Sequence, residues 1–138
     1  MKTAVVYWSG TGNTEAMAGS VAEGAKSAGA EVSVFTAADF SADMVDQFDS
    51  IAFGCPSMGS EQLEDSEFEP MFNACEAKLS GKKVGLFGSY GWGDGEWMRN
   101  WEEQCIAAVM AGEGVICNEA PDDTATEQCV ALGKALAS

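Results

Sequence analysis

Short apolar runs rich in β-branched residues alternate along the chain with longer segments whose apolar residues recur every three or four positions. The runs predict β-strands over residues 4–8, 32–36, 51–54 and 84–88. Residues 4–8 are apolar almost without interruption, which is typical of a strand covered on both faces. The longer segments between the runs predict amphipathic helices.

Two helices are expected in the first half of the chain, with a short helical turn near residues 41–47 between them. Gly29 and Gly81 are natural C-terminal caps for these helices, and Pro70 fits in or near the first turn of the second. Their apolar positions are Met17, Val21 and Ala25 in the first helix and Phe68, Phe72, Cys75 and Leu79 in the second.

The helix that contains Trp97 has two possible ends. It either runs to Met110 or stops near Cys105. In the second case residues 106–110 begin a strand, which the Gly-Glu-Gly sequence at residues 112–114 interrupts.

Two helix starts are indicated by capping residues. Asp94 is predicted as the N-cap of the helix in which Trp101 follows Trp97 by one turn. Thr124 and Glu127 predict a capping box at the start of the last helix. One face of that helix carries Cys129, Leu132, Gly133 and Leu136.

This alternation of strands and helices predicts an α/β fold with a parallel sheet and helices on both faces. Residues 1–138 contain no long polar linker, repeat or low-complexity tract, so one domain is expected. Ligands of such sheets bind beyond the carboxyl ends of the strands, at the point where the strand order reverses.

Small and polar residues gather after three of the predicted strands, at residues 9–14, 55–61 and 89–95. Because parallel strands end at the same edge of a sheet, the three loops predict one composite pocket. Glycines let the backbone approach a ligand closely, and the hydroxyl groups donate hydrogen bonds.

The first loop has the character of a phosphate site. Its amides lie at a predicted helix N-terminus, and Ser9, Thr11 and Thr14 add hydroxyl groups. A Walker loop and a dinucleotide fingerprint are both excluded, because no GxxxxGK[ST] occurs and Glu15 replaces the third glycine. Without a Lys or Arg in the loop, a monophosphate ester fits better than a polyphosphate. The alternative is an ordinary strand-to-helix turn.

The other two loops offer apolar surface for a planar ring. Met58 and Trp92 could cover its two faces, Trp92 by stacking and Met58 through its thioether. Both could instead be core residues, although Gly91 and Gly93 favour an exposed loop around Trp92.

Composition narrows the possible functions. The chain has 22 acidic and 7 basic residues, a net charge of −15, which disfavours nucleic acid and anionic membrane as partners. It has no histidine, so a Ser-His-Asp triad is excluded. Five cysteines without a CxxC pair indicate reduced thiols in the cytoplasm. No apolar stretch approaches the roughly 20 residues of a membrane span.

The three loops together resemble those of the flavodoxins, in particular the short-chain flavodoxins of anaerobic bacteria. The resemblance covers nearly the whole chain and extends to residues 67–70 and 97–98. It implies a flavodoxin-like, doubly wound five-stranded sheet of order 2-1-3-4-5 and one noncovalent FMN. It also implies a monomeric electron carrier rather than an enzyme. Its flavin would shuttle between semiquinone and hydroquinone at low potential, and its partners would be redox enzymes with basic docking surfaces.

The resemblance also implies roles for individual residues. Residues 9–14 would bind the FMN phosphate, Trp92 and Met58 would cover the isoalloxazine, Glu61 would accept from the flavin N3–H, and the Gly91 amide would meet the pyrimidine carbonyl. The implied cofactor-binding residues are Ser9, Gly10, Thr11, Gly12, Asn13, Thr14, Pro56, Ser57, Met58, Gly59, Glu61, Ser89, Tyr90, Gly91, Trp92 and Gly93.

Two physical features would tune the flavin. Glycine at position 59 permits a type II′ turn, so the Gly59 carbonyl could rotate toward the flavin N5–H after the first electron arrives. The negative charge would oppose the second electron, so that potential should be strongly reducing and should rise with ionic strength. The acidic residues expected to contribute are Glu61, Glu64, Asp65, Glu67, Asp94, Glu96, Asp122 and Asp123.

Three other functions are compared with this one. A small FMN-dependent NAD(P)H:quinone or nitro reductase would need a nicotinamide site, and the sequence offers no second phosphate loop or basic patch for it. A signalling receiver would need carboxylates around a phosphorylated Asp, where Cys55 ends the third strand. A structural domain without cofactor would not bind FMN.

Overall fold

The computed structural model describes residues 1–10, 12–58, 63–91, 95–105 and 107–137. Its strands are β1 (Lys2–Tyr7), β2 (Glu31–Thr36), β3 (Ser50–Gly54), β4 (Lys83–Tyr90), β5 (Val109–Met110) and β6 (Val115–Asn118). Its α-helices are α1 (Asn13–Ser27), α2 (Phe68–Glu76), α3 (Glu96–Gln104) and α4 (Asp123–Leu136), and two 3₁₀ helices, η1 (Ala37–Asp39) and η2 (Ala42–Gln47), link β2 to β3.

The strands form one parallel sheet in the order β2-β1-β3-β4-β5, and β6 also pairs with β4. β5 lies beside the start of β4, with Val109 opposite Lys83, and β6 lies beside its end, with Asn118 opposite Tyr90. The predicted sheet order is therefore confirmed. The fifth position is shared by two short strands, and α3 ends at Gln104 instead of running to Met110.

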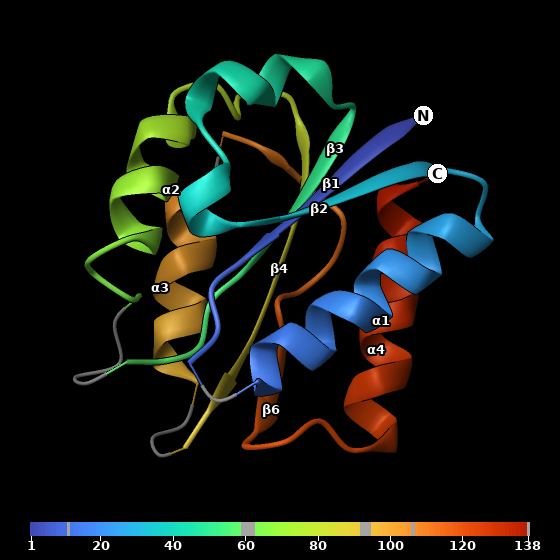
Figure 1. Cartoon of the computed structure of the whole chain (residues 1–138), viewed down its shortest axis with the longest axis vertical. Helices are drawn as coiled ribbons and strands as arrows, with labels where there is room; N and C mark the ends of the chain where they lie inside the picture. The colour runs from blue at the N-terminus through green and yellow to red at the C-terminus, as the bar shows by residue number, and fades with distance from the viewer. Residues whose placement is uncertain (11, 59–62, 92–94, 106, 138) are drawn as a thin grey trace.

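Helices cover both faces of the sheet, α2 and α3 on one and α1 and α4 on the other (Figure 1). The α1–α4 pair packs backbone against backbone. A Cβ on Gly24 would lie 2.0 Å from the Val130 carbonyl oxygen, and one on Gly133 would lie 2.0 Å from that of Val21. This contact requires glycine in both helices.

Two of the predicted helix caps are wrong. Gly95, with φ of +89°, is the N-cap of α3, so the predicted cap at Asp94 is one residue early, and Asp94 itself lies outside the described residues. The N-cap of α4 is Asp122, whose side chain accepts a hydrogen bond of 2.8 Å from the Ala125 amide. The helix thus begins before Thr124, which is already helical and cannot form the predicted capping box.

The other predicted helix boundaries agree with the structure except at the end of α2. Gly29, with φ of +96°, follows the end of α1, and Pro70 lies in the first turn of α2. α2 ends at Glu76, short of the predicted end, and a turn connects it to Gly81, whose φ is +73°. Leu79 is therefore buried from that turn rather than from the helix.

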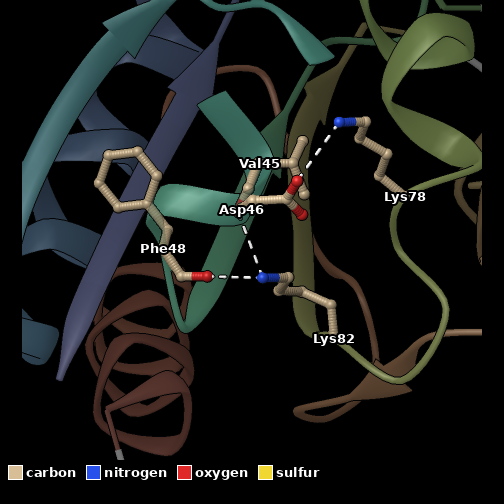
Figure 2. Close-up of polar contacts among 5 residues, drawn as sticks. All are labelled: Val45, Asp46, Phe48, Lys78 and Lys82. Atoms are coloured by element: carbon tan, nitrogen blue, oxygen red, sulfur yellow. Dashed lines mark hydrogen bonds and ion pairs between the residues drawn. The ribbon is translucent and has the colours of Figure 1, made fainter. Parts of the chain in front are cut away.

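Lys82 fastens the segment before β3 to the start of β4. Its Nζ donates to the carbonyl oxygens of Val45, at 3.2 Å, and Phe48, at 2.7 Å (Figure 2). Lys78 forms a more exposed ion pair with Asp46 at 3.3 Å. These contacts lie at the edge where the strands begin, near the two chain termini (Figure 1). The opposite edge, where the strands end, is left to the three predicted loops.

Within the described ranges, no helix combines the length and the apolar character that a bilayer crossing requires.

Candidate functional site

A cavity of about 490 Å³ opens at the edge where β1, β3 and β4 end. This volume lies within the roughly 300–1,000 Å³ that small-molecule and cofactor sites occupy. The cavity is lined by Trp8, Gly10, Asn13, Pro56, Ser57, Met58, Ser89, Tyr90, Gly91, Glu119 and Ala120. The three predicted loops therefore contribute to one pocket, as expected from the parallel sheet.

Most of the predicted cofactor residues that the structure describes line this cavity. Ser9 and Gly12, in the loop between β1 and α1, and Thr14, in the first turn of α1, are described but do not line the cavity. The remaining predicted residues, Thr11, Gly59, Glu61, Trp92 and Gly93, lie outside the described residues, so their roles stay predictions.

The loop between β1 and α1 places a helix N-terminus beside the cavity. Gly12 is the N-cap of α1, with φ of +94°, and its amide donates to Ser9 Oγ at 3.0 Å. Since a glycine N-cap has no side chain, it leaves the amides of the first turn for another acceptor. Asn13, the first helical residue, lines the cavity.

Thr14 connects this loop to the end of β4. Its side chain is 1% exposed, and its Oγ1 lies 3.3 Å from Ser89 Oγ and accepts from the Ser89 amide at 3.4 Å. In this arrangement the Thr14 hydroxyl orders the base of the cavity between α1 and β4.

Backbone hydrogen bonds align the other two loops. The Cys55 amide donates to the Phe87 carbonyl at 3.1 Å, and the Ser57 amide donates to the Ser89 carbonyl at 2.9 Å. The sheet register thus continues past β3 and brings Met58 to the cavity from one side and Tyr90 from the other. Tyr90 is itself supported by the Trp97 ring, with centroids 5.5 Å apart.

Three lining residues were missed by the sequence analysis: Trp8, Glu119 and Ala120. Trp8 ends the apolar run of the first strand, which suggested only core packing. Its ring instead lies beside Gly10, where a Cβ would come within 3.1 Å of it. No sequence signal indicated Glu119. It reaches the cavity because β6 ends at Asn118, and its amide then donates to the Tyr90 carbonyl at 2.8 Å.

Glu64 is a buried carboxylate below the second loop. It is 4% exposed and accepts from the amides of Ser66 (2.9 Å), Glu67 (2.8 Å) and Phe68 (2.9 Å), and from the Ser66 hydroxyl. Burial alone would raise the pKa of Glu64, but these four hydrogen bonds outweigh it and lower the pKa to about 2. Glu64 therefore stays ionised at neutral pH and belongs to the structure of the loop rather than to its solvated surface.

The five cysteines are all free and buried. Burial raises the pKa of the Cys55, Cys105 and Cys129 thiols to about 12 and that of Cys75 to about 11. Thiols with such pKa values are protonated and unreactive at neutral pH, which fits the reduced state that the sequence indicated. Among the residues that the structure describes, no cluster of three or more His, Cys, Asp or Glu is suited to hold a metal ion.

Comparison with known proteins now gives the family. The sequence matches the flavodoxin family description over residues 5–133. It is 50% identical over 135 residues to a flavodoxin from Megasphaera elsdenii, with 96% of each chain covered. The chain belongs to the flavodoxin family. It is also 45% identical over 140 residues to a flavodoxin from Clostridium beijerinckii, covering 97% of this chain and 98% of that one.

Solved flavodoxin structures agree with the fold. The solution structure of two-electron reduced Megasphaera elsdenii flavodoxin superposes with a TM-score of 0.91 and covers 98% of each chain. Oxidised flavodoxin 1 from Bacillus cereus is 26% identical, with a TM-score of 0.86 over 99% of this chain and 97% of that one. Flavodoxins are FMN-binding electron-transfer proteins, so this chain is an electron carrier with FMN as cofactor and not an enzyme.

The residues at the cavity fit this flavodoxin cofactor. Amides at the start of α1 suit a phosphate ester. No Lys or Arg occurs among the described lining residues, which suits a monophosphate ester better than a polyphosphate. Trp8, Met58 and Tyr90 provide the apolar and aromatic surface against which a planar ring packs.

Proposed function

We propose that the chain is a single-domain, monomeric, low-potential one-electron carrier that works in the cytoplasm and uses the second of the two one-electron steps of bound FMN. The observation that carries this proposal is a cavity of about 490 Å³ in which a helix N-terminus and an aromatic wall meet. Bound FMN supplies the redox chemistry, because its ring accepts and releases one electron at a time. The protein supplies binding, orientation and electrostatics.

In this proposal the start of α1 holds the phosphate. The amides of residues 13 and 14 and the hydroxyl groups of residues 9–14 surround it, and the α1 dipole adds about half a positive charge. Ser9 Oγ already accepts from the Gly12 amide, which fixes the turn before the phosphate arrives. Asn13 and Gly10 approach the cavity from this side.

The second and third loops hold the ring. Met58 packs against one face, and Trp92 is proposed to cover the other. Glu61 and the Gly91 amide are proposed to bind the polar edge of the ring, which would set its orientation. Pro56, Ser57, Ser89 and Tyr90 complete the described wall. The proposed turn at residues 58–61 adds a backbone carbonyl, that of Gly59, as a responsive hydrogen-bond acceptor.

The charge of the protein supports the low potential. The second one-electron step adds negative charge at the cavity, where Glu119 already forms part of the lining. The net charge of −15 opposes that step and favours a strongly reducing carrier. The same field attracts partners with a basic docking surface and speeds their association.

The reductase alternative is less well supported. Relatives that are 50% and 45% identical are named flavodoxins, and the described cavity presents no cationic side chain for a nicotinamide phosphate. Turnover of NADH or NADPH by the purified protein would favour the reductase instead.

Calorimetry of the apoprotein with FMN and with riboflavin tests the proposal. We expect FMN to bind one equivalent tightly, and riboflavin to bind more weakly because it lacks the phosphate that the α1 amides hold. The visible spectrum recorded during stepwise dithionite reduction should then show two separate one-electron steps. The absence of a binding heat for FMN would overturn the assignment, whereas equal affinity for both ligands would overturn only the phosphate site.

A further inference from the structure

Glu64 lies in the segment that leads into α2, where hydrogen bonds hold its backbone as well as its carboxylate. Besides the four hydrogen bonds to its carboxylate, its backbone amide donates to Cys55 Sγ at 3.3 Å, and its carbonyl oxygen accepts from the Glu69 amide at 2.8 Å. Leu63, 8% exposed, and Phe68, 0% exposed, are both part of one hydrophobic core cluster. The carboxylate therefore fixes residues 64–69 as one unit.

Cys55 connects this unit to the sheet. It is the first residue after β3, is fully buried, and its carbonyl oxygen accepts from the Trp97 indole at 3.3 Å. The thiol also lies 3.5 Å from the Pro56 carbonyl oxygen. The hydrogen bond between Cys55 and Glu64 thus joins the chain before Met58 to the chain after it.

A second connection runs from this unit to the cavity itself. Glu67, whose amide is held by Glu64, presents its own carboxylate to the Trp8 indole, and Trp8 Nε1 donates to Glu67 Oε1 at 3.1 Å. Trp8 then lines the cavity and stands beside Gly10 in the predicted phosphate loop. The contacts from Glu64 through Glu67 to Trp8 join two of the three loops of the site.

We infer that Glu64 is a positioning residue for the cofactor cavity: it fixes the start of α2, and through Glu67 it holds the Trp8 indole as one wall of the cavity. This inference rests on the proposed function for its consequence, which is cofactor affinity. The role of Glu64 in fixing the Trp8 indole concerns the apoprotein and does not depend on the cofactor. The effect of Glu64 on the cavity is carried by the Glu67–Trp8 contact.

Three measurements test this positioning role: hydrogen exchange of backbone amides and of the Trp8 indole in the apoprotein, and the affinity for FMN. We expect Glu64→Gln to speed hydrogen exchange at the amides of Glu67 and Phe68 and at the Trp8 indole N–H by about tenfold, because the neutral amide cannot accept from all of its present donors. FMN affinity should fall by about tenfold as well, since the Trp8 wall loses its fixed position.

Two matched variants separate positioning from charge and from simple helix capping. Asp65→Asn removes the same charge from the neighbouring, exposed residue and should leave Trp8 exchange and FMN affinity within about twofold. Asp122→Ala removes the side-chain cap of α4 and should lower the denaturation midpoint without changing Trp8 exchange.

Variants of Glu67 test the connecting contact. Glu67→Ala should reproduce the Trp8 and FMN effects of Glu64→Gln, and Glu67→Gln, which keeps an acceptor for the indole, should restore both. If Glu64→Gln accelerates only the amides of residues 66–68 and leaves Trp8 exchange and FMN affinity unchanged, Glu64 is a helix cap and the inference is wrong. If the wild-type protein does not bind FMN, the proposed function fails, while Trp8 exchange in the apoprotein still decides the positioning role.

Discussion

Glu64 and Asp65 are adjacent in the chain, yet their surroundings make them different chemical groups. Asp65 is exposed and solvated, whereas Glu64 is buried among hydrogen-bond donors from Ser66, Glu67 and Phe68. The sequence analysis named both among the acidic residues expected to oppose the second electron, because neither composition nor spacing shows which carboxylate turns inward. The difference has a measurable consequence for stability.

Lowering the pH should remove the contribution of Glu64 to stability. Its pKa is lowered from 4.5 to about 2 in the folded protein, so the unfolded chain takes up the proton first. The contribution, roughly 3 kcal/mol, is complete above pH 4.5 and is lost as the pH falls toward 2. Urea unfolding of the wild type and Glu64→Gln at several pH values measures it. We expect the gap between them to shrink below pH 4.5; a gap that stays constant down to pH 3 would contradict this account.

Gly88 illustrates a second constraint at the residue scale, the close approach of β4 to the first residue after β3. A Cβ at position 88 would lie 2.1 Å from the Cys55 carbonyl oxygen and 3.3 Å from the Trp97 ring. We expect Gly88→Ala to reduce the free energy of unfolding of the apoprotein by about 3 kcal/mol, since the clash is with backbone. Gly91→Ala is the matched control, because a Cβ there meets no described atom within 4 Å and should change stability by less than about 0.5 kcal/mol. Equal losses in the two variants would show that crowding at Cys55 is not the cause.

At the scale of elements, the strands and most helices followed from the hydrophobic pattern, because burial on both faces of the sheet leaves a nearly continuous apolar run in each central strand. β1 and β3 are buried along nearly their whole length, and their predicted limits differ from the observed ones by at most two residues. The errors lie at the starts of α3 and α4 and at the end of α2. Asp122 caps α4 through its side chain, two residues before the Thr124 that the Thr–Glu spacing selected. Gly95 caps α3 through its backbone conformation alone, which a search for an acidic cap does not detect.

The part of the candidate site formed by loops that follow predicted strands could be predicted from the sequence. Gly10, Met58 and Tyr90 come directly after predicted strands, and the parallel sheet brings them together. Glu119 was not predictable in this way, because its place depends on the break between β5 and β6, where two endings of the preceding helix fitted the sequence equally well. Trp8 was missed for a different reason: an apolar residue at a strand end has the same sequence signature in the core and at a cavity wall.

Lys82 provides a prediction about how elements are held together. Its Nζ donates to two carbonyl oxygens that end the η2 segment, those of Val45 and Phe48 (Figure 2). Lys82→Met keeps the aliphatic stem but removes both charge-assisted hydrogen bonds, so the free energy of unfolding should fall by about 2 kcal/mol. Lys78→Met breaks the exposed pair with Asp46 and should cost less than about 0.5 kcal/mol. Chemical denaturation of both variants checks this, and a larger loss in Lys78→Met would reverse the ranking of the two contacts.

At the scale of the whole molecule, charge is separated between the two edges of the sheet. Strands begin and α-helices end at the edge remote from the cavity, and six of the seven basic residues lie at those positions; only Arg99, in α3, does not. The six are Lys2, Lys26, Lys78, Lys82, Lys83 and Lys134. The cavity edge instead carries Glu119 in its lining, with Glu15 and Glu67 around the hollow beside Trp8. The edge with the cavity, where the proposed function places the cofactor, is therefore the one that lacks these six positive charges, and its field would attract the basic partner of that proposal.

The same separation predicts which carboxylates affect the second one-electron potential. One carboxylate about 10 Å from the ring, at an effective dielectric constant near 20, opposes the added charge by roughly 1.7 kcal/mol, and salt screening reduces this to about 0.5 kcal/mol, or on the order of 20 mV. Glu119→Gln, at the cavity, should therefore raise that potential by on the order of 20 mV. Glu31→Gln, at the start of β2, lies roughly the length of a strand away and should change it by only a few millivolts.

Redox titration of the two variants and the wild type at low and high salt measures these shifts. Screening should raise the wild-type potential with ionic strength and reduce the difference between Glu119→Gln and wild type, because both effects have the same Coulombic origin. A potential that does not depend on salt, or equal shifts from Glu119→Gln and Glu31→Gln, would show that the reducing power arises from local hydrogen bonds to the ring rather than from the charge separation across the sheet.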